Sequence, residues 1–345
     1  MKFAIKQEQC QTCSSNAERE RTRCETSKIK KVKSKRIQNK TAESRRTLPL
    51  AMLYGTAIWL LAGLFQAQWW VQFACFILSV LLVMRINSKN LLIRIYSRSV
   101  SVAFIFLSCA AVFLFPSWTG GLVQLCCIAA LMLLFDSYQD QAAVEKAYYA
   151  FLLLGISSML DANIIFYLPL LWIMMKIIVY ALSWRTFFAS LLGLATPYWF
   201  MIGWLMWQKN GDLQAIVSLF AVQDILQFPI GFSSIPLSYQ LIMAFSTLLM
   251  IIGSTHFIHS SFRDKIRVRQ IYYGFITLGL FSLALLVLQP HNEVALRMLI
   301  LAASPLIGHY WALTNSRISN IIFIIITVVL LALTAFNLWI SSSVS

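Results

Sequence analysis

The chain carries few charged side chains for its length. Only 12% of its 345 residues are charged, whereas 59% are hydrophobic, and a soluble protein has about 25% charged residues. A soluble domain of this size could not cover its surface with so few charges, so the composition predicts that lipid solvates much of the protein. The aromatic content of 14%, with 11 Trp, is typical of helices that end at two membrane–water interfaces.

Motifs of soluble enzymes are also missing. The sequence has no glycine-rich phosphate loop, no Ser nucleophile elbow and no zinc helix with two His. The seven cysteines do not form a disulfide framework, because four of them lie in apolar runs where a thiol behaves as a small hydrophobe: Cys75, Cys109, Cys126 and Cys127. The N-terminal segment holds the other three, Cys10, Cys13 and Cys24. This segment offers no His to complete a four-ligand zinc site, so we expect free thiols and predict no metal and no cofactor.

Residues 1–47 form a separate block with 14 Lys/Arg and 5 Glu, a net charge of 14 − 5 = +9. Its apolar residues recur at neither helical nor strand period, so we expect a disordered tail rather than a folded domain. A basic tail beside a membrane is attracted to anionic lipid headgroups. Nucleic-acid binding is not expected, because the block has no interleaved aromatics and no recognisable module.

From residue 48 to the C-terminus at 345, apolar runs alternate with short polar breaks, as a helical membrane domain requires. The predicted fold is therefore an all-α polytopic bundle with about 11 spans, in a range of 10–12. The predicted spans are 48–66, 69–84, 99–116, 121–136, 147–160, 164–182, 186–206, 239–257, 271–288, 295–312 and 319–340.

Basic residues predict the orientation of the bundle. If the N-terminus is cytoplasmic, twelve Lys/Arg of the membrane domain fall inside and two, Lys209 and Arg297, fall outside. Since cytoplasmic loops are enriched in Lys and Arg, this count favours a cytoplasmic N-terminus. An odd number of spans then leaves the C-terminus outside.

One external loop, 208–238, is longer than the others. Its stretch Leu213–Phe228 is amphipathic and is expected to lie in the outer interface. Two roles are open for it: a helix that only caps the bundle, or a lid over a site that faces lipid.

Ionisable residues near the outer ends of the spans are the candidate site residues, because a charge in or near hydrocarbon is costly. Asp161 lies between the fifth and sixth spans and is the candidate catalytic base toward a lipid-linked substrate. Arg297, Glu293 and Asp224 are the candidate substrate-binding residues. Glu293 and Arg297 are also spaced i, i+4 and could form a purely structural pair on one helix face, as could Asp161 and Arg297 at the interface.

Ionisable residues at the inner ends have simpler interpretations. Asp136, Asp140 and Glu145 form an acidic loop, which we interpret as a solvated connector rather than a cation site. His256 and His259 are three residues apart beside a basic cluster, and the end of a helix in the interface explains them.

Helix ends in the sequence carry a resemblance to a known family. The stretch Arg85–Arg98 and the later motifs Tyr167-Leu-Pro-Leu-Leu-Trp172, Ser183-Trp-Arg-Thr-Phe187 and Thr196-Pro-Tyr198 resemble a domain-of-unknown-function family of bacterial multi-pass inner-membrane proteins. The likeness covers roughly residues 45–340. It implies a location in the bacterial inner (cytoplasmic) membrane and brings no activity with it.

The order of the later motifs is also similar to the middle of the membrane glycosyltransferases that use polyprenyl-phosphate sugars. Those enzymes usually place an acidic residue in the first external loop, which here reads Gln66-Ala67-Gln68. No catalytic residue is therefore carried over.

Three function classes stay open, and the sequence does not decide whether the protein is an enzyme. The first is a protein that acts on lipid-linked glycans in envelope assembly, and the second is a non-catalytic scaffold that binds envelope-complex proteins. The third is a small-solute transporter, in which inverted repeats would be expected.

Overall fold

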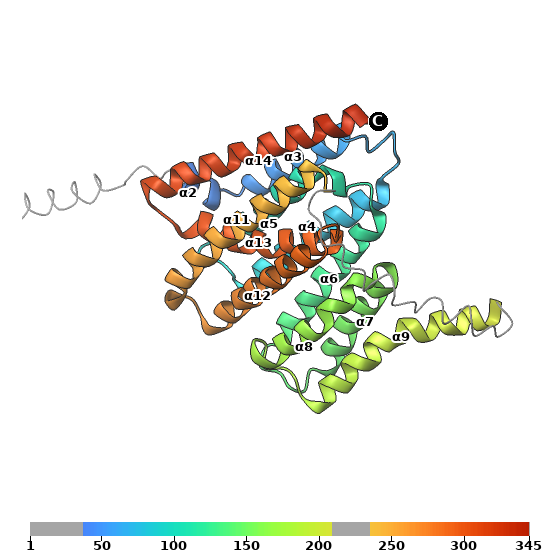
Figure 1. Cartoon of the computed structure of the whole chain (residues 1–345). Coiled ribbons are helices and arrows are strands. Elements are labelled where there is room, and N and C mark those ends of the chain that lie inside the picture. The colour runs from blue at the N-terminus through green and yellow to red at the C-terminus, as the bar shows by residue number, and fades with distance from the viewer. Residues whose placement is uncertain (1–36, 209–234, 345) are drawn as a thin grey trace, which may run out of the picture.

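The computed structural model describes residues 37–208 and 235–344, and every regular element in these ranges is a helix. Figure 1 shows the helices as a bundle with α14 along one flank and α9 along the other. The α-helices are α2 (Ile37–Glu43), α3 (Thr47–Leu61), α4 (Trp70–Asn90), α5 (Ser99–Ala110), α6 (Trp118–Asp136), α7 (Val144–Leu160), α8 (Tyr167–Ile177), α9 (Trp184–Gln208), α11 (Leu237–Ser260), α12 (Ile266–Leu288), α13 (Glu293–Leu313) and α14 (Arg317–Val344).

Each of the eleven predicted spans overlaps one of the helices from α3 onward. Within the described ranges, seven helices are long and apolar enough to cross a membrane: α4, α6, α9, α11, α12, α13 and α14. The other four, α3, α5, α7 and α8, have 15, 12, 17 and 11 residues, fewer than the roughly 20 that span a hydrocarbon core. The all-helical membrane bundle is therefore confirmed, and the count of eleven spans stays a prediction.

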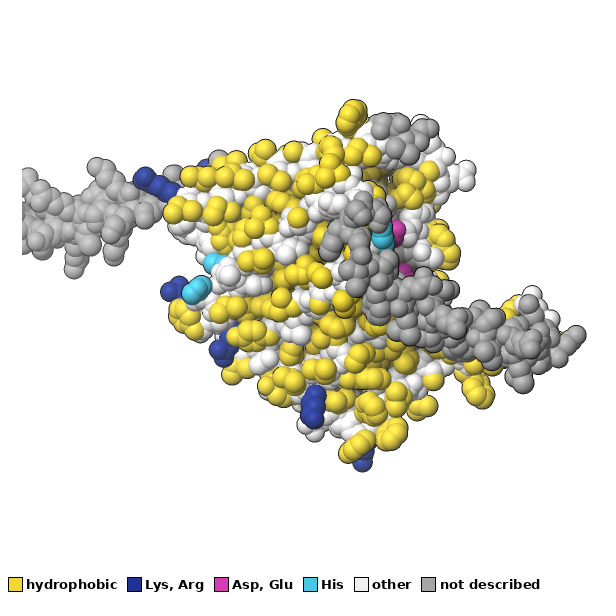
Figure 2. All heavy atoms as spheres, viewed as in Figure 1, with side chains coloured by type: hydrophobic (Ala, Val, Ile, Leu, Met, Phe, Trp, Pro, Cys, Tyr) yellow, Lys and Arg dark blue, Asp and Glu magenta, His cyan; other side chains and the backbone are white. Residues whose placement is uncertain are grey.

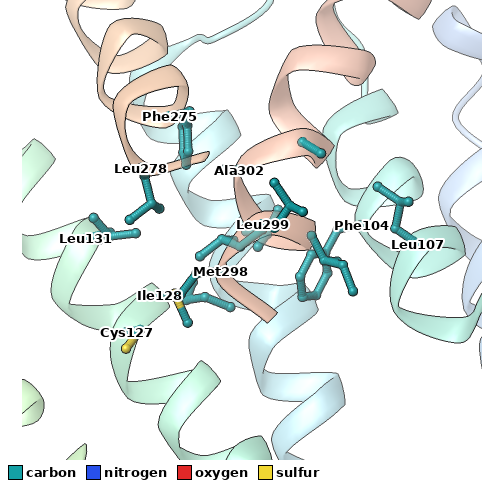
Figure 3. Packing of buried hydrophobic residues seen from close by; sticks show 14 of the residues in the cluster. Phe104, Leu107, Cys127, Ile128, Leu131, Phe275, Leu278, Met298, Leu299 and Ala302 are labelled. Carbon is teal, nitrogen blue, oxygen red and sulfur yellow. The ribbon is translucent and has the colours of Figure 1, made fainter. Parts of the chain in front are cut away.

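Helix α13 forms the centre of the bundle. Its membrane-length window is buried along its whole length, because α5, α6, α11 and α12 all pack against it. Figure 3 shows Met298, Leu299 and Ala302 of α13 among apolar side chains of its neighbours. Such a helix has no face left for lipid, so any polar residue on it must find its partners inside the protein.

Successive helices run in opposite directions, which gives the bundle two distinct ends. Contacts between helix ends and loops that are far apart in the sequence mark these two ends, for example Arg94 with Asp264 at one and Gln72 with the Pro116 carbonyl at the other. We call the first the basic end and the second the far end. Of the Lys and Arg residues in the described ranges, Arg297 alone lies near the far end. Basic side chains accordingly gather on one edge in Figure 2.

Helix α2 lies inside the segment that the sequence analysis assigned to the tail. Its Gln38 is buried, and the side-chain Nε2 donates hydrogen bonds to the Trp311 carbonyl at 2.8 Å and to Thr314 Oγ1 at 2.6 Å. The last carbonyls of a helix have no partner within that helix, so Gln38 satisfies the C-terminal end of α13. The rest of the predicted tail, residues 1–36, and most of the predicted loop, 209–234, lie outside the described residues.

Candidate functional site

Arg297 enters the bundle core from the first turns of α13. Its side chain is only 7% exposed. Nη2 donates to the Leu114 carbonyl at 2.6 Å, and Nη1 donates to Gln124 Oε1 at 3.2 Å. Nε is buried without a hydrogen-bond partner. The guanidinium is thus held by neutral acceptors, and its Nε–H has no acceptor.

The charge of Arg297 is poorly compensated. Among the residues that the structure describes, Glu293 is its nearest carboxylate, with Oε2 at 3.9 Å from Nη2, and the Glu293 side chain is 44% exposed. A half-exposed partner at that distance is screened by solvent, so this pair contributes little. A buried cation without a close counter-ion is costly in a protein interior, which makes this position a candidate site for an external anion.

The N-terminus of α6 faces the same guanidinium. A Cβ atom built on Gly120, in the first turn of α6, would lie 2.7 Å from Arg297 Nε, so only glycine allows the two groups to approach this closely. Ser117 caps the helix by accepting a hydrogen bond from the Gly120 N–H at 3.2 Å. Because a helix N-terminus carries partial positive charge, it adds to the field of Arg297 instead of offsetting it.

A small cavity of about 40 Å³ lies beside these groups. Its polar lining residues are Gln72, Ser79, Ser108, Ser117, Gln124 and Arg297. Ser108 Oγ, like Arg297 Nε, is buried and unpartnered. The volume admits one or a few water-sized groups. It therefore suits the tip of an anionic group, such as a phosphate oxygen, and does not hold a sugar ring.

The predicted site residues are only partly brought together. Arg297 and Glu293 form the weak pair described above, whereas Asp161 takes no part in an ion pair among the described residues. Asp161 Oδ1 accepts hydrogen bonds from the Asn163 N–H at 3.0 Å and from Asn163 Nδ2 at 2.9 Å. Its carboxylate begins the short helix η2 (Ala162–Phe166) and is half-buried at the far end. Asp224 lies outside the described residues.

A second cluster of ionisable residues lies at the basic end of α13, around His309. The His309 side chain is fully buried, and its Nε2 lies 3.4 Å from Asp264 Oδ2. Asp264 is also buried and pairs through Oδ1 with Arg94 Nε at 2.5 Å. Burial alone raises the pKa of Asp264, but the hydrogen bonds from His309 and Arg94 outweigh this effect and hold the pKa below its ordinary value.

Aromatic rings and a second histidine surround His309. Its ring centroid lies 4.9 Å from that of Tyr272 and 5.5 Å from that of His256. Nδ1 of His256 and Nδ1 of His309 are both buried without a hydrogen-bond partner. His256 is therefore not simply the end of a helix in the interface, although His259 is exposed as predicted. No group of three or more His, Cys, Asp or Glu side chains in the described ranges is arranged to hold a metal ion.

His309 was not among the predicted site residues, although the sequence carries one signal for it. His309 is an ionisable residue inside an apolar span, which is reason enough to treat it as a candidate. Its partners could not be inferred, because Arg94 and Asp264 come from loops far apart in the sequence.

The acidic loop after α6 is less solvated than predicted. The Asp136 side chain is only 10% exposed and pairs with Lys89 Nζ at 2.6 Å, so it ties α6 to α4. Asp140 fits the prediction better, because its side chain is 47% exposed and lies 3.6 Å from Lys146 Nζ.

Comparison with known proteins adds nothing to this geometry. No protein-family model matches the chain, and it has no significant match among curated proteins or solved structures.

Proposed function

We propose that the chain is a multi-pass protein of the bacterial inner membrane that acts on a lipid-linked glycan in envelope assembly. In this proposal Arg297 binds the phosphate of the lipid carrier. One observation carries it: a buried guanidinium whose Nε–H has no acceptor lies beside the first turn of α6, and within the described ranges its only ion pair is the long one with Glu293. Phosphate is the anion that arginine and helix N-termini bind best in combination.

Asp161 is the proposed general base in this scheme, in keeping with the glycosyltransferase-like order of the motifs. Its Oδ1 is occupied by Asn163, which leaves Oδ2 as the oxygen that could accept a proton from the acceptor hydroxyl. Arg297 contacts α6 at Gln124. Asp161 directly follows α7, which packs against α6, and this arrangement supports one shared site at the far end. Glu293 and Asp224 remain the proposed additional substrate contacts.

Neutralising Arg297 should weaken phosphate-lipid binding. In Arg297→Gln we expect the dissociation constant for a polyprenyl phosphate to rise about tenfold or more, because a charge-assisted hydrogen bond to phosphate is lost. Arg297→Lys should give an intermediate loss, since lysine keeps the charge but not the planar fork of donors. Binding would be measured on the purified full-length protein by native mass spectrometry, with inorganic phosphate in a parallel arm.

The matched control is Arg185→Gln, which neutralises an exposed arginine at the basic end. It should leave binding unchanged. Equal affinity for the polyprenyl phosphate in the protein with and without Arg297 would contradict the proposal. Binding of inorganic phosphate alone would identify an anion site that does not recognise the lipid.

The proposed orientation places the far end, and therefore Arg297, on the external side. A reporter fused after Ser345 should be active on the external face, and one fused before Met1 should be active in the cytoplasm, because the Lys/Arg bias retains the basic end inside. A C-terminal reporter active in the cytoplasm would contradict either the odd span count or the orientation.

A proton-coupled transporter is the second candidate, and the His309–Asp264 pair favours it. Buried His and Asp side chains in a membrane bundle are typical components of proton relays. The two candidate functions depend on different residues of α13. Activity on a lipid-linked glycan requires Arg297 at the far end, whereas proton-coupled transport requires His309 at the basic end.

A further inference from the structure

A crevice opens at the basic end, away from Arg297. It has a volume of about 430 Å³, within the range of small-molecule sites. Helices α3, α5 and α14 form its walls, and α2 lies at its mouth. Its apolar lining comes mainly from Leu50, Ala51, Val102, Phe106, Phe323 and Leu330.

The crevice is closed toward the far end. Tyr54 OH donates a hydrogen bond to Thr334 Oγ1 at 2.9 Å, which joins α3 to α14, and Tyr54 also stacks on Phe106 at 4.8 Å. Tyr54 lies one helical turn beyond Leu50 on α3, and Thr334 lies one turn beyond Leu330 on α14. The residues of α14 that line the crevice run from Phe323 to Leu330, a rise of about 10 Å. The apolar lining therefore covers about two thirds of the hydrocarbon depth of one leaflet, which is about 15 Å.

The mouth of the crevice is polar and basic. Lys40, Ser44 and Thr47 line it, and the buried Gln38 fixes α2 in place by its bonds to the end of α13. Arg45 and Arg46 follow α2 directly and are both exposed, and Glu43 is the one acidic residue of this segment.

We infer that this crevice is a binding site for one anionic phospholipid of the adjacent leaflet. An acyl chain would lie along the apolar wall between α3 and α14, and the phosphate would lie beside Lys40. The combination of an apolar slot that covers much of one leaflet with a basic mouth fits a lipid better than a soluble ligand. The excess of positive charge favours an anionic over a zwitterionic headgroup.

The test uses the delipidated full-length protein and native mass spectrometry. Phosphatidylglycerol and phosphatidylethanolamine with identical acyl chains would be added separately. We expect one phosphatidylglycerol to bind with about fivefold preference over phosphatidylethanolamine. Lys40→Gln should remove most of this preference while some binding persists, because the apolar slot is intact. Ala51→Phe, which fills the slot, should abolish binding of both lipids.

Arg185→Gln is again the control, because it removes an equal charge from a different part of the basic end, and it should leave the preference unchanged. If Ala51→Phe does not fold, Thr327→Phe on the opposite wall fills the same space. Equal binding of both lipids to the unmodified protein, or an unchanged preference in Lys40→Gln, would overturn the inference. Lipid binding that survives a folded slot-filling variant would overturn it as well.

Discussion

Replacing Gly193 with Leu is expected to force helices α7 and α9 apart and to lower the free energy of unfolding by about 3 kcal/mol or more. A Cβ atom at Gly193 would lie 2.3 Å from the Tyr148 carbonyl oxygen, and at Gly155 it would lie 2.8 Å from the Leu194 carbonyl oxygen. Each helix thus presents a glycine to the backbone of the other. Small residues allow this close approach, which is a main source of helix association in membranes.

Gly203 supplies the control on the same helix. A Cβ atom there meets nothing within 4 Å, so Gly203→Leu adds the same side chain to α9 without a clash. Thermal unfolding of the purified protein in one detergent would compare the two variants. A Gly193→Leu melting temperature equal to that of Gly203→Leu would mean that α7 and α9 do not pack as closely as described.

Hydropathy alone was enough to locate the helices from α3 onward, because a long apolar run in a membrane protein has to satisfy its backbone internally. It gave no sign of α2, which is short and polar. It could not separate a helix that spans from one that is only buried. The run 99–116 predicts a single span, yet α5 ends at Ala110 and the 3-10 turn η1 follows at Val112–Leu114. Nearly all of α5 is covered by protein. Its residues are apolar because they pack against other helices, and not because they face lipid.

The candidate sites were predictable only where the partners are close in sequence. The i, i+4 spacing predicted the Glu293–Arg297 pair, which forms at 3.9 Å. The acceptors that hold the guanidinium, Leu114 and Gln124, belong to η1 and α6, more than 170 residues earlier. Glycine at position 120 gave no local signal either, because its role is to make room for a side chain from another helix.

Asp264→Asn should lower the stability of the protein by about 2 kcal/mol at neutral pH. The substitution keeps the shape of the side chain but leaves Arg94 without its counter-ion and weakens the contact to His309 Nε2. Breaking a fully buried ion pair would cost more, but the Arg94 side chain is 35% exposed and can turn toward water. The control Asp140→Asn changes a surface pair with Lys146 and should have little effect.

The pH dependence distinguishes a charged Asp264 from one that serves only as a packing group. Its pKa in the folded protein lies below the ordinary value of about 3.9. The unfolded chain therefore binds this proton more readily, and the contribution of the carboxylate is fully present above about pH 4 and is lost as the pH falls through the folded pKa. Melting temperatures measured between pH 3 and pH 7 should thus show an acid-induced decrease in the unmodified protein that is smaller in Asp264→Asn. Parallel curves for the two proteins would show that Asp264 is not the stabilising carboxylate, and the ion pair with Arg94 would then contribute nothing measurable to the fold.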